Sequence, residues 1–267
     1  MRIRHLVAVA AALLAAHATP AAAQRTGDRA RLVFTVSGAY TQGRGLWSVP
    51  NQPVQQTEDD TLPTVDRMAL NRNIKSTFSA GVSGTYYPGE HVGLTADAFL
   101  LGLGFDDTCT LIPPIESDLN RQICDDIDNQ EKSAAAVTLS VGGVFRAFSR
   151  EAISPFARVS AGLLFSNQSS VLMQGVRDDA VLLTVYEDSK RTRVSPTLAF
   201  GVGATTPIGR AYHLRWKVRD NIVGIEAVTG PTTAPRFEPP HERKYKHLFS
   251  VLIGIDVVLE RNRGRRY

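Results

Sequence analysis

Large apolar residues alternate with small or polar residues over segments of about ten residues along most of the chain. The sharpest example is segment 211–221, AYHLRWKVRDN, where an aromatic or aliphatic residue occupies every second position from Tyr212 to Val218. Successive side chains of a β-strand point to opposite faces, so this pattern predicts strands with one apolar face. Eight segments follow it and are predicted strands: 31–41, 75–87, 91–105, 134–147, 154–166, 192–205, 211–221 and 245–259.

The connections between these segments alternate in length. Three are short and contain turn residues, at 88–90, 149–151 and 207–210. Four are long and polar, at 42–74, 106–133, 167–191 and 222–244. This alternation predicts an antiparallel up-and-down sheet of eight strands, with all the long connections at one end.

The third long connection contains an alternation of its own, in 171–176 and 180–185 around Asp178 and Asp179. This pattern predicts a hairpin in which the fifth and sixth strands continue beyond the rest of the sheet. If the two stretches are counted as additional strands, the sheet would have ten.

The face opposite the large apolar residues consists of glycine, alanine, serine and threonine with occasional charges. Such a face fits a crowded lumen better than bulk water, and strands of about 9–11 residues match a tilted membrane crossing. We therefore expect an all-β, eight-stranded transmembrane barrel with its apolar face outward, rather than a secreted soluble β-sandwich or ligand-binding barrel. The charged residues expected in the lumen, where opposite charges can neutralise each other, are Asp97, Arg146, Arg158, Arg215, Lys217, Arg219 and Asp256.

A barrel of eight strands has an interior about wide enough for its own side chains, which disfavours a passive porin. Aromatic residues near the segment ends fit the interfacial girdles of a membrane barrel. These residues are Tyr40, Tyr86, Tyr87, Phe145, Phe156, Tyr212, Trp216 and Tyr245.

The first 23 residues have the three parts of a secretory signal peptide. Arg2 and Arg4 precede an apolar stretch at 6–16, and small residues lead to a predicted cleavage after Ala23. The apolar stretch, about eleven residues long, is too short for a spanning helix, so we expect a mature barrel domain at 24–267. Without Arg2 and Arg4, 28 Lys and Arg face 26 Asp and Glu, and the resulting charge of +2 implies no nucleic-acid partner.

Export would place the two cysteines, Cys109 and Cys124, in an oxidising compartment, which favours a disulfide between them. Closing a loop of about 15 residues stabilises a fold by about 3 kcal/mol in the chain-entropy model. A redox or metal-binding pair is disfavoured, because the C-x-x-C spacing and a nearby histidine are both missing.

The first two long connections are acidic. Carboxylates can bind divalent cations, but no calcium-loop spacing occurs, so a solvated surface is the favoured interpretation. No pattern predicts a metal or a cofactor. The acidic residues are Glu58, Asp59, Asp60, Asp66, Asp106, Asp107, Glu116, Asp118, Asp125, Asp126, Asp128 and Glu131.

Together these features resemble the small outer-membrane β-barrel proteins of Gram-negative-type bacteria, the OmpA-, OmpX- and OmpW-like superfamily. The resemblance covers nearly the whole mature chain and includes the turn motif at 201–220 and the closing strand at 247–259, HLFSVLIGIDVVL. It implies a place in the cell outer membrane, contact with outer-membrane lipids and lipopolysaccharide, and insertion by the barrel assembly machinery. The implied role is structural, surface contact or small-solute passage, with an unknown ligand for the extracellular loops.

Some outer-membrane barrels are enzymes, and the residue types that a lipid hydrolase, acyltransferase or protease needs are present. His247 and Ser250 form the most obvious pair, but they are three positions apart, so strict alternation places them on opposite faces. No GxSxG, P-loop, HExxH or dinucleotide motif occurs. The sequence therefore favours a non-enzymatic protein, with an outer-membrane lipid-modifying enzyme as the alternative. The other residues of these types are His213, Asp97 and Asp256.

Overall fold

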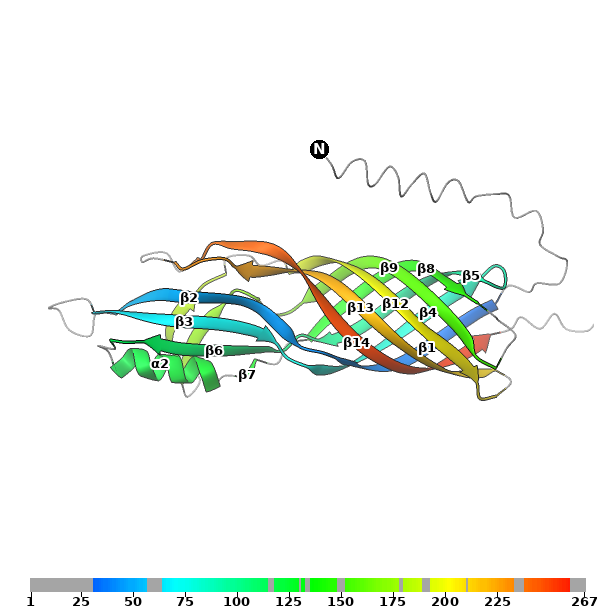
Figure 1. Cartoon of the computed structure of the whole chain (residues 1–267), viewed down its shortest axis with the longest axis horizontal. Helices are drawn as coiled ribbons and strands as arrows, with labels where there is room; N and C mark the ends of the chain where they lie inside the picture. The colour runs from blue at the N-terminus through cyan, green and yellow to red at the C-terminus, as the bar shows by residue number, and fades with distance from the viewer. Residues whose placement is uncertain are drawn as a thin grey trace, which may run out of the picture.

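Eight strands close into an antiparallel barrel in the computed structural model of the chain (Figure 1). Their order around the barrel is β1-β14-β13-β12-β9-β8-β5-β4, and β4 pairs with β1 to complete it. The predicted signal peptide, 1–23, lies outside the described residues. The structure describes residues 31–56, 64–114, 118–129, 131–132, 135–147, 152–177, 180–188, 193–209, 211–232 and 238–259.

All eight predicted segments form the barrel strands, which confirms the predicted fold class. The first and last strands pair from Leu32 with Leu259 to Thr41 with Ser250, so the start of β1 and the end of β14 lie at the end with the short turns. Closure pairs the strands on both sides and leaves no free barrel edge. The bounds are β1 (Arg31–Thr41), β4 (Thr77–Tyr87), β5 (Val92–Gly102), β8 (Ala135–Arg146), β9 (Ser154–Ser166), β12 (Val194–Pro207), β13 (Tyr212–Val228) and β14 (His241–Leu259).

The large apolar side chains of the barrel point outward, as predicted. Phe78 is 82% exposed and Ile253 is 64% exposed, whereas the inward neighbours Ser79 and Leu252 are buried. We call this outward-facing set the apolar band. Along β13 it runs from Tyr212 to Val218, and it has no charged member on that stretch.

The residues that face inward are small because neighbouring strands approach closely. A Cβ at Gly162 would collide with the carbonyl oxygen of Leu139 and with Ser140 on β8. Buried threonines and serines, including Thr35, Thr138 and Ser160, fill other inward positions. The lumen is therefore packed with side chains, as expected for eight strands.

A second folded unit stands on the long-connection end of the barrel, and the sequence pattern did not predict it. It contains a four-stranded sheet in the order β2-β3-β6-β7, a helix and a two-stranded hairpin. We call this unit the outer cap. Its elements are β2 (Arg44–Gln56), β3 (Thr64–Ile74), β6 (Phe105–Ile112), α2 (Asp118–Asn129), β7 (Glu131–Lys132), β10 (Met173–Arg177) and β11 (Ala180–Tyr186).

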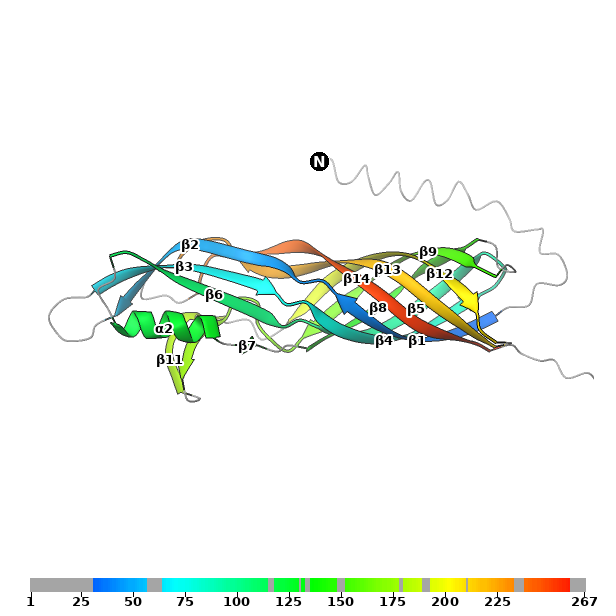
Figure 2. The same cartoon turned by 60° about the horizontal axis from the view of Figure 1, so that its bottom comes forward.

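One hydrophobic core joins the outer cap to the barrel mouth. Met68 and Leu70 of β3 and Ile123 of α2 are fully buried in the same cluster as Val223 of β13 and Leu248 of β14. Figure 2 shows α2 beside β6, with the hairpin projecting past the helix. The cap is therefore packed on the barrel and covers its mouth.

The predicted hairpin forms as β10 and β11, but it does not continue the fifth and sixth strands. β9 ends at Ser166 and β12 begins at Val194, while β10 and β11 form a separate sheet. The strands that continue beyond the barrel are β13 and β14, which stay paired up to Val228 and His241. The barrel has eight strands, and the ten-strand count is not observed.

Candidate functional site

The lumen contains a ladder of cations on one strand. Arg215, Lys217 and Arg219 are consecutive inward positions of β13, and each is at least nine-tenths buried. They point inward because their neighbours Trp216 and Val218 belong to the apolar band. The strand alternation thus places three cations inside a narrow barrel.

The first cation of the ladder is neutralised by Asp256 of β14. Arg215 donates to the Asp256 carboxylate from Nε at 2.9 Å and from Nη2 at 2.7 Å. The second carboxylate oxygen accepts a hydrogen bond of 2.8 Å from Thr35 Oγ1. Both oxygens are therefore used within the described residues, and the pair ties β13 to β14 and β1.

A second ion pair crosses the lumen between β5 and β9. Arg158 Nη2 donates to Asp97 Oδ2, and the same oxygen accepts a hydrogen bond of 3.3 Å from Ser140 Oγ. Arg158 also donates to Thr95 Oγ1 at 2.6 Å. Two buried ion pairs, with aromatic rings beside them, thus occupy the centre of the barrel.

Two aromatic residues expected in the girdles lie inside the lumen instead. Tyr87 and Phe156 are 2% and 5% exposed, and each has an arginine over its ring. Arg146 is 4.4 Å from the Tyr87 ring centroid, and Arg215 is 4.7 Å from that of Phe156. Strand alternation turns both rings inward, because their neighbours Tyr86 and Ala157 face outward, and a cation over each ring stabilises it in the charged interior.

Arg146 sits at the short-turn end rather than in the ion-paired centre. It is half-buried, and its guanidinium donates to the Glu90 carbonyl oxygen at 3.0 Å and 3.3 Å. Arg146 thus links β8 to the turn between β4 and β5.

The outer cap is built around a buried arginine that the sequence reading did not single out. Arg72 of β3 is fully buried and forms a two-pronged ion pair with Asp107 of β6, at 2.5 Å and 2.6 Å. Its Nη2 also donates to the Leu172 carbonyl oxygen at 2.8 Å. The guanidinium lies over the rings of Trp47 and Phe105, at 5.4 Å and 5.3 Å.

Two acidic residues expected on a solvated surface are buried in the cap. Asp107 is paired with Arg72, and Asp66 accepts a hydrogen bond of 2.9 Å from Asn120 Nδ2 on α2. Each is 1% exposed. Their polar partners come from distant segments, so a local pattern of acidic residues could not reveal their burial.

Cys109 and Cys124 form the disulfide that the sequence predicted. It joins β6 to α2, with a Cα–Cα distance of 5.2 Å.

A buried tyrosine forms a further contact in the cap. Burial raises the pKa of Tyr186, so its phenol stays protonated and donates to Gln52 Oε1 at 3.0 Å. The disulfide thus ties α2 to β6, and the hydrogen bond ties β11 to β2.

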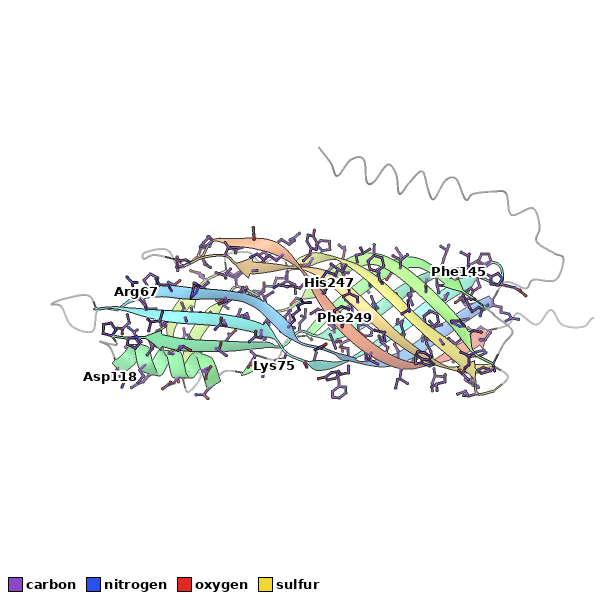
Figure 3. All side chains as sticks on the ribbon, in the orientation of Figure 1. Arg67, Lys75, Asp118, Phe145, His247 and Phe249 are labelled. Carbon is purple, nitrogen blue, oxygen red and sulfur yellow. A yellow bond between two sulfur atoms is a disulfide. The ribbon has the colours of Figure 1, made fainter. Side chains whose placement is uncertain are left out.

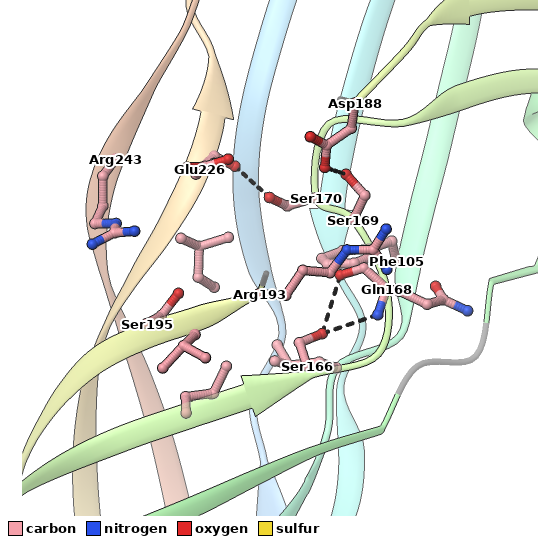
Figure 4. A pocket seen from close by; sticks show the side chains of 14 residues that line it. Phe105, Ser166, Gln168, Ser169, Ser170, Asp188, Arg193, Ser195, Glu226 and Arg243 are labelled. Atoms are coloured by element: carbon pink, nitrogen blue, oxygen red, sulfur yellow. Dashed lines mark hydrogen bonds between the residues drawn. The ribbon is translucent and has the colours of Figure 1, made fainter. Parts of the chain in front are cut away.

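A cavity lies where β12 and β13 separate below the cap. Their pairing ends at Thr197 and Val223, although β13 continues to Val228. Phe105 and Leu164 form an apolar part of the wall, and Arg193, Arg243 and Glu226 form a polar part (Figure 4). The cavity therefore combines apolar and charged groups at the barrel rim.

The structure brings His213 and Asp256 together, but it separates the most obvious candidate pair, His247 and Ser250. His247 faces outward beside Asp220, with 2.7 Å between Nδ1 and Oδ2, and its ring stacks near Phe249 (Figure 3). Ser250 faces the lumen and is buried. Asp97 and Asp256 are both bound to arginines, and His213 pairs in register with Asp256.

Among the described residues, no three His, Cys, Asp or Glu side chains are grouped so that they could hold a metal ion. No helix in the described part of the chain is long and apolar enough to cross a membrane.

No protein-family model matches the sequence. No curated protein matches it either. Solved structures similar to the chain include the outer membrane protein OprG from Pseudomonas aeruginosa, with 8% identity, a TM-score of 0.48, and coverage of 88% of this chain and 98% of that one. Neisserial surface protein A has 8% identity, a TM-score of 0.41, and coverage of 86% and 97%. The outer membrane protease OmpT from Escherichia coli has 10% identity, a TM-score of 0.33, and coverage of 88% and 98%.

Proposed function

We propose that this chain is an integral protein of the bacterial outer membrane that holds the outer cap at the cell surface for contact with an external partner. The observation that carries the proposal is the combination of an uncharged apolar band with a cap that is packed on the barrel mouth. The band suits the hydrocarbon of a bilayer, and the polar cap suits water. Outer-membrane lipids and lipopolysaccharide would surround the band, and the barrel assembly machinery would insert the chain.

The polar pair Asp220 and His247 supports this placement. It lies directly above Val218 and Phe249, which are outward residues of the apolar band on β13 and β14. Tyr245, one outward position further along β14, is 62% exposed and fits an interfacial aromatic. The band thus has a polar boundary on the side of the cap.

We also propose that the role is not enzymatic. The support is the arrangement of the candidate groups, since His247 and Ser250 lie on opposite faces and Asp97 and Asp256 are held by arginines. A nucleophile needs a base within hydrogen-bonding reach, and these residues do not provide that pair.

Replacing Ile253 with arginine is expected to destabilise the barrel in lipid by about 2–4 kcal/mol. Ile253 is in the middle of β14, between Trp216 of β13 and Gly38 of β1, so the new charge would face hydrocarbon. The measurement is urea-dependent folding into lipid vesicles, followed by tryptophan fluorescence. The matched control is Val181→Arg on β11, an exposed apolar residue outside the barrel, with an expected change within about 0.5 kcal/mol. Equal effects at both sites would mean that lipid does not surround the barrel.

Planar bilayer recordings separate surface contact from small-solute passage. The purified chain is expected to insert without steady ion conductance, because two ion pairs and their neighbouring side chains fill the lumen below the cap. A control recording with a chain that carries D97L and R158M tests whether the ion pair is the obstruction. Steady conductance of the unaltered chain would contradict the contact role and favour small-solute passage.

A further inference from the structure

The charges inside the barrel do not balance. Arg158, Arg215, Lys217 and Arg219 are buried, and the buried carboxylates of the barrel strands are those of Asp97 and Asp256. Each carboxylate already binds one arginine, Arg158 and Arg215 respectively. Two positive charges, on Lys217 and Arg219, are thus left over within the described lumen.

Arg219 has unused donors in this buried position. Its Nε and Nη2 are inaccessible to solvent and have no hydrogen-bond partner among the described residues, although the side chain is only 4% exposed. The guanidinium lies over the ring of Phe99, 5.5 Å from its centroid. The ring attracts the cation but supplies no negative charge, and Nε and Nη2 remain without an acceptor among the described residues.

Lys217 faces the same space. It is 6% exposed, and it forms no ion pair or hydrogen bond with the described residues. A small cavity is lined by Lys217, Arg215 and Arg219, by Asp97, by hydroxyl side chains such as Ser83, and by Phe99 and Leu252. Three cations thus face one space with a single carboxylate, which is already paired with Arg158.

A buried charge without a partner is strongly destabilising, and a water molecule could accept a hydrogen bond but could not supply the missing negative charge. The nearby carboxylate of Asp97 is occupied by Arg158 and Ser140. An anion from solution is the remaining source of negative charge. The small size of the cavity, which has polar as well as apolar walls, favours a monatomic ion.

We propose that Lys217 and Arg219 bind a small inorganic anion of the chloride class inside the barrel. The N–H groups of Arg219 would donate to the ion, and the Lys217 ammonium would supply the second positive charge. The bound ion reduces the charge surplus of the lumen and stabilises the folded barrel, because it binds the folded state and not the unfolded chain.

The first experiment measures urea unfolding of the full chain in lipid vesicles, with the tryptophan fluorescence as the signal. Sodium chloride is compared with sodium gluconate at equal ionic strength, so that general screening by salt is the same in both series. The unfolding midpoint is expected to rise with chloride and then saturate, and to stay constant in gluconate. Identical curves in the two salts would overturn the proposal.

The variants R219M and K217M are expected to lose the difference between chloride and gluconate. The matched control is Arg67→Met, which removes an exposed cation of β3 in the outer cap and should keep the full chloride effect. A chloride effect that persists in both lumen variants would place the ion elsewhere and contradict the assignment.

A second measurement does not depend on whether the variants fold. Crystals of the unaltered chain grown in sodium bromide are expected to give an anomalous scattering peak within hydrogen-bonding distance of Arg219. Absence of a peak in the lumen, or peaks at the surface alone, would overturn the proposal.

Discussion

Replacing Arg72 with methionine is expected to lower the free energy of unfolding of the outer cap by about 3–5 kcal/mol, because Asp107 would be left as a buried charge without its partner. Both residues are essentially inaccessible to solvent, and Arg72 also donates to the Leu172 carbonyl oxygen. The contacts with Trp47 and Phe105 would be lost as well. The expected result is a cap that unfolds at lower urea concentration than the barrel.

Protease digestion of the folded chain in vesicles measures this effect, because an opened cap is cut while the barrel is protected by lipid. Trp47 provides a second signal, since its ring contacts Arg72 directly. The control Arg67→Met alters an exposed position on the same strand and should change stability by less than about 0.5 kcal/mol. If R72M and R67M are digested at the same rate, Arg72 does not hold the cap together.

The second large effect is expected from Asp97→Leu in the lumen. Loss of this carboxylate leaves Arg158 without its counter-charge and raises the number of unpaired lumen cations, so we expect the barrel to lose about 3–5 kcal/mol of unfolding free energy. The measurement is urea unfolding in vesicles. The substitution should lower the urea concentration at which the barrel unfolds. The protease resistance of the cap should stay nearly unaltered until the barrel itself unfolds.

A double variant distinguishes the loss of a partner from the loss of a favourable contact. Replacing Asp97 with leucine and Arg158 with methionine removes both charges, and apolar replacement of a whole buried pair is often neutral. We expect D97L with R158M to recover most of the stability lost in D97L alone. A double variant no more stable than D97L would show that the unpaired Arg158 charge is not the cause.

The barrel could be predicted from the sequence because the alternation that specifies each strand involves residues close together in the chain. Each strand has period-2 alternation. Large apolar residues lie between Arg215, Lys217 and Arg219, so the pattern alone indicates that these three side chains point into the lumen. The pairing of Cys109 with Cys124 was also predictable, since the two cysteines, if export is as predicted, lie in an oxidising compartment and allow one intramolecular disulfide.

The outer cap could not be predicted in this way. The buried face of β3 contains Met68, Leu70 and Ile74, but it begins with Asp66 and has Arg72 between Leu70 and Ile74. The charges interrupt the apolar alternation, so the segment resembles a polar loop. The lumen aromatics Tyr87 and Phe156 were misplaced for a related reason. A tyrosine or phenylalanine at a strand end fits either a girdle or a lumen, but strand alternation turns Tyr87 and Phe156 inward beside the outward Tyr86 and Ala157. In the lumen, an arginine then lies over each ring.

The sequence by itself determined the positions of the eight barrel strands, their antiparallel order and the outward apolar face, because strand alternation and connection length act between residues close in the chain. The structure decided that the barrel has eight strands rather than ten, because β10 and β11 form a sheet of their own. The tertiary structure alone decided which charges are paired. Asp107 is 35 positions from Arg72, and Asp256 is 41 positions from Arg215. A buried charge is tolerated only beside a partner, and the register of folded strands determines which distant residue that partner is.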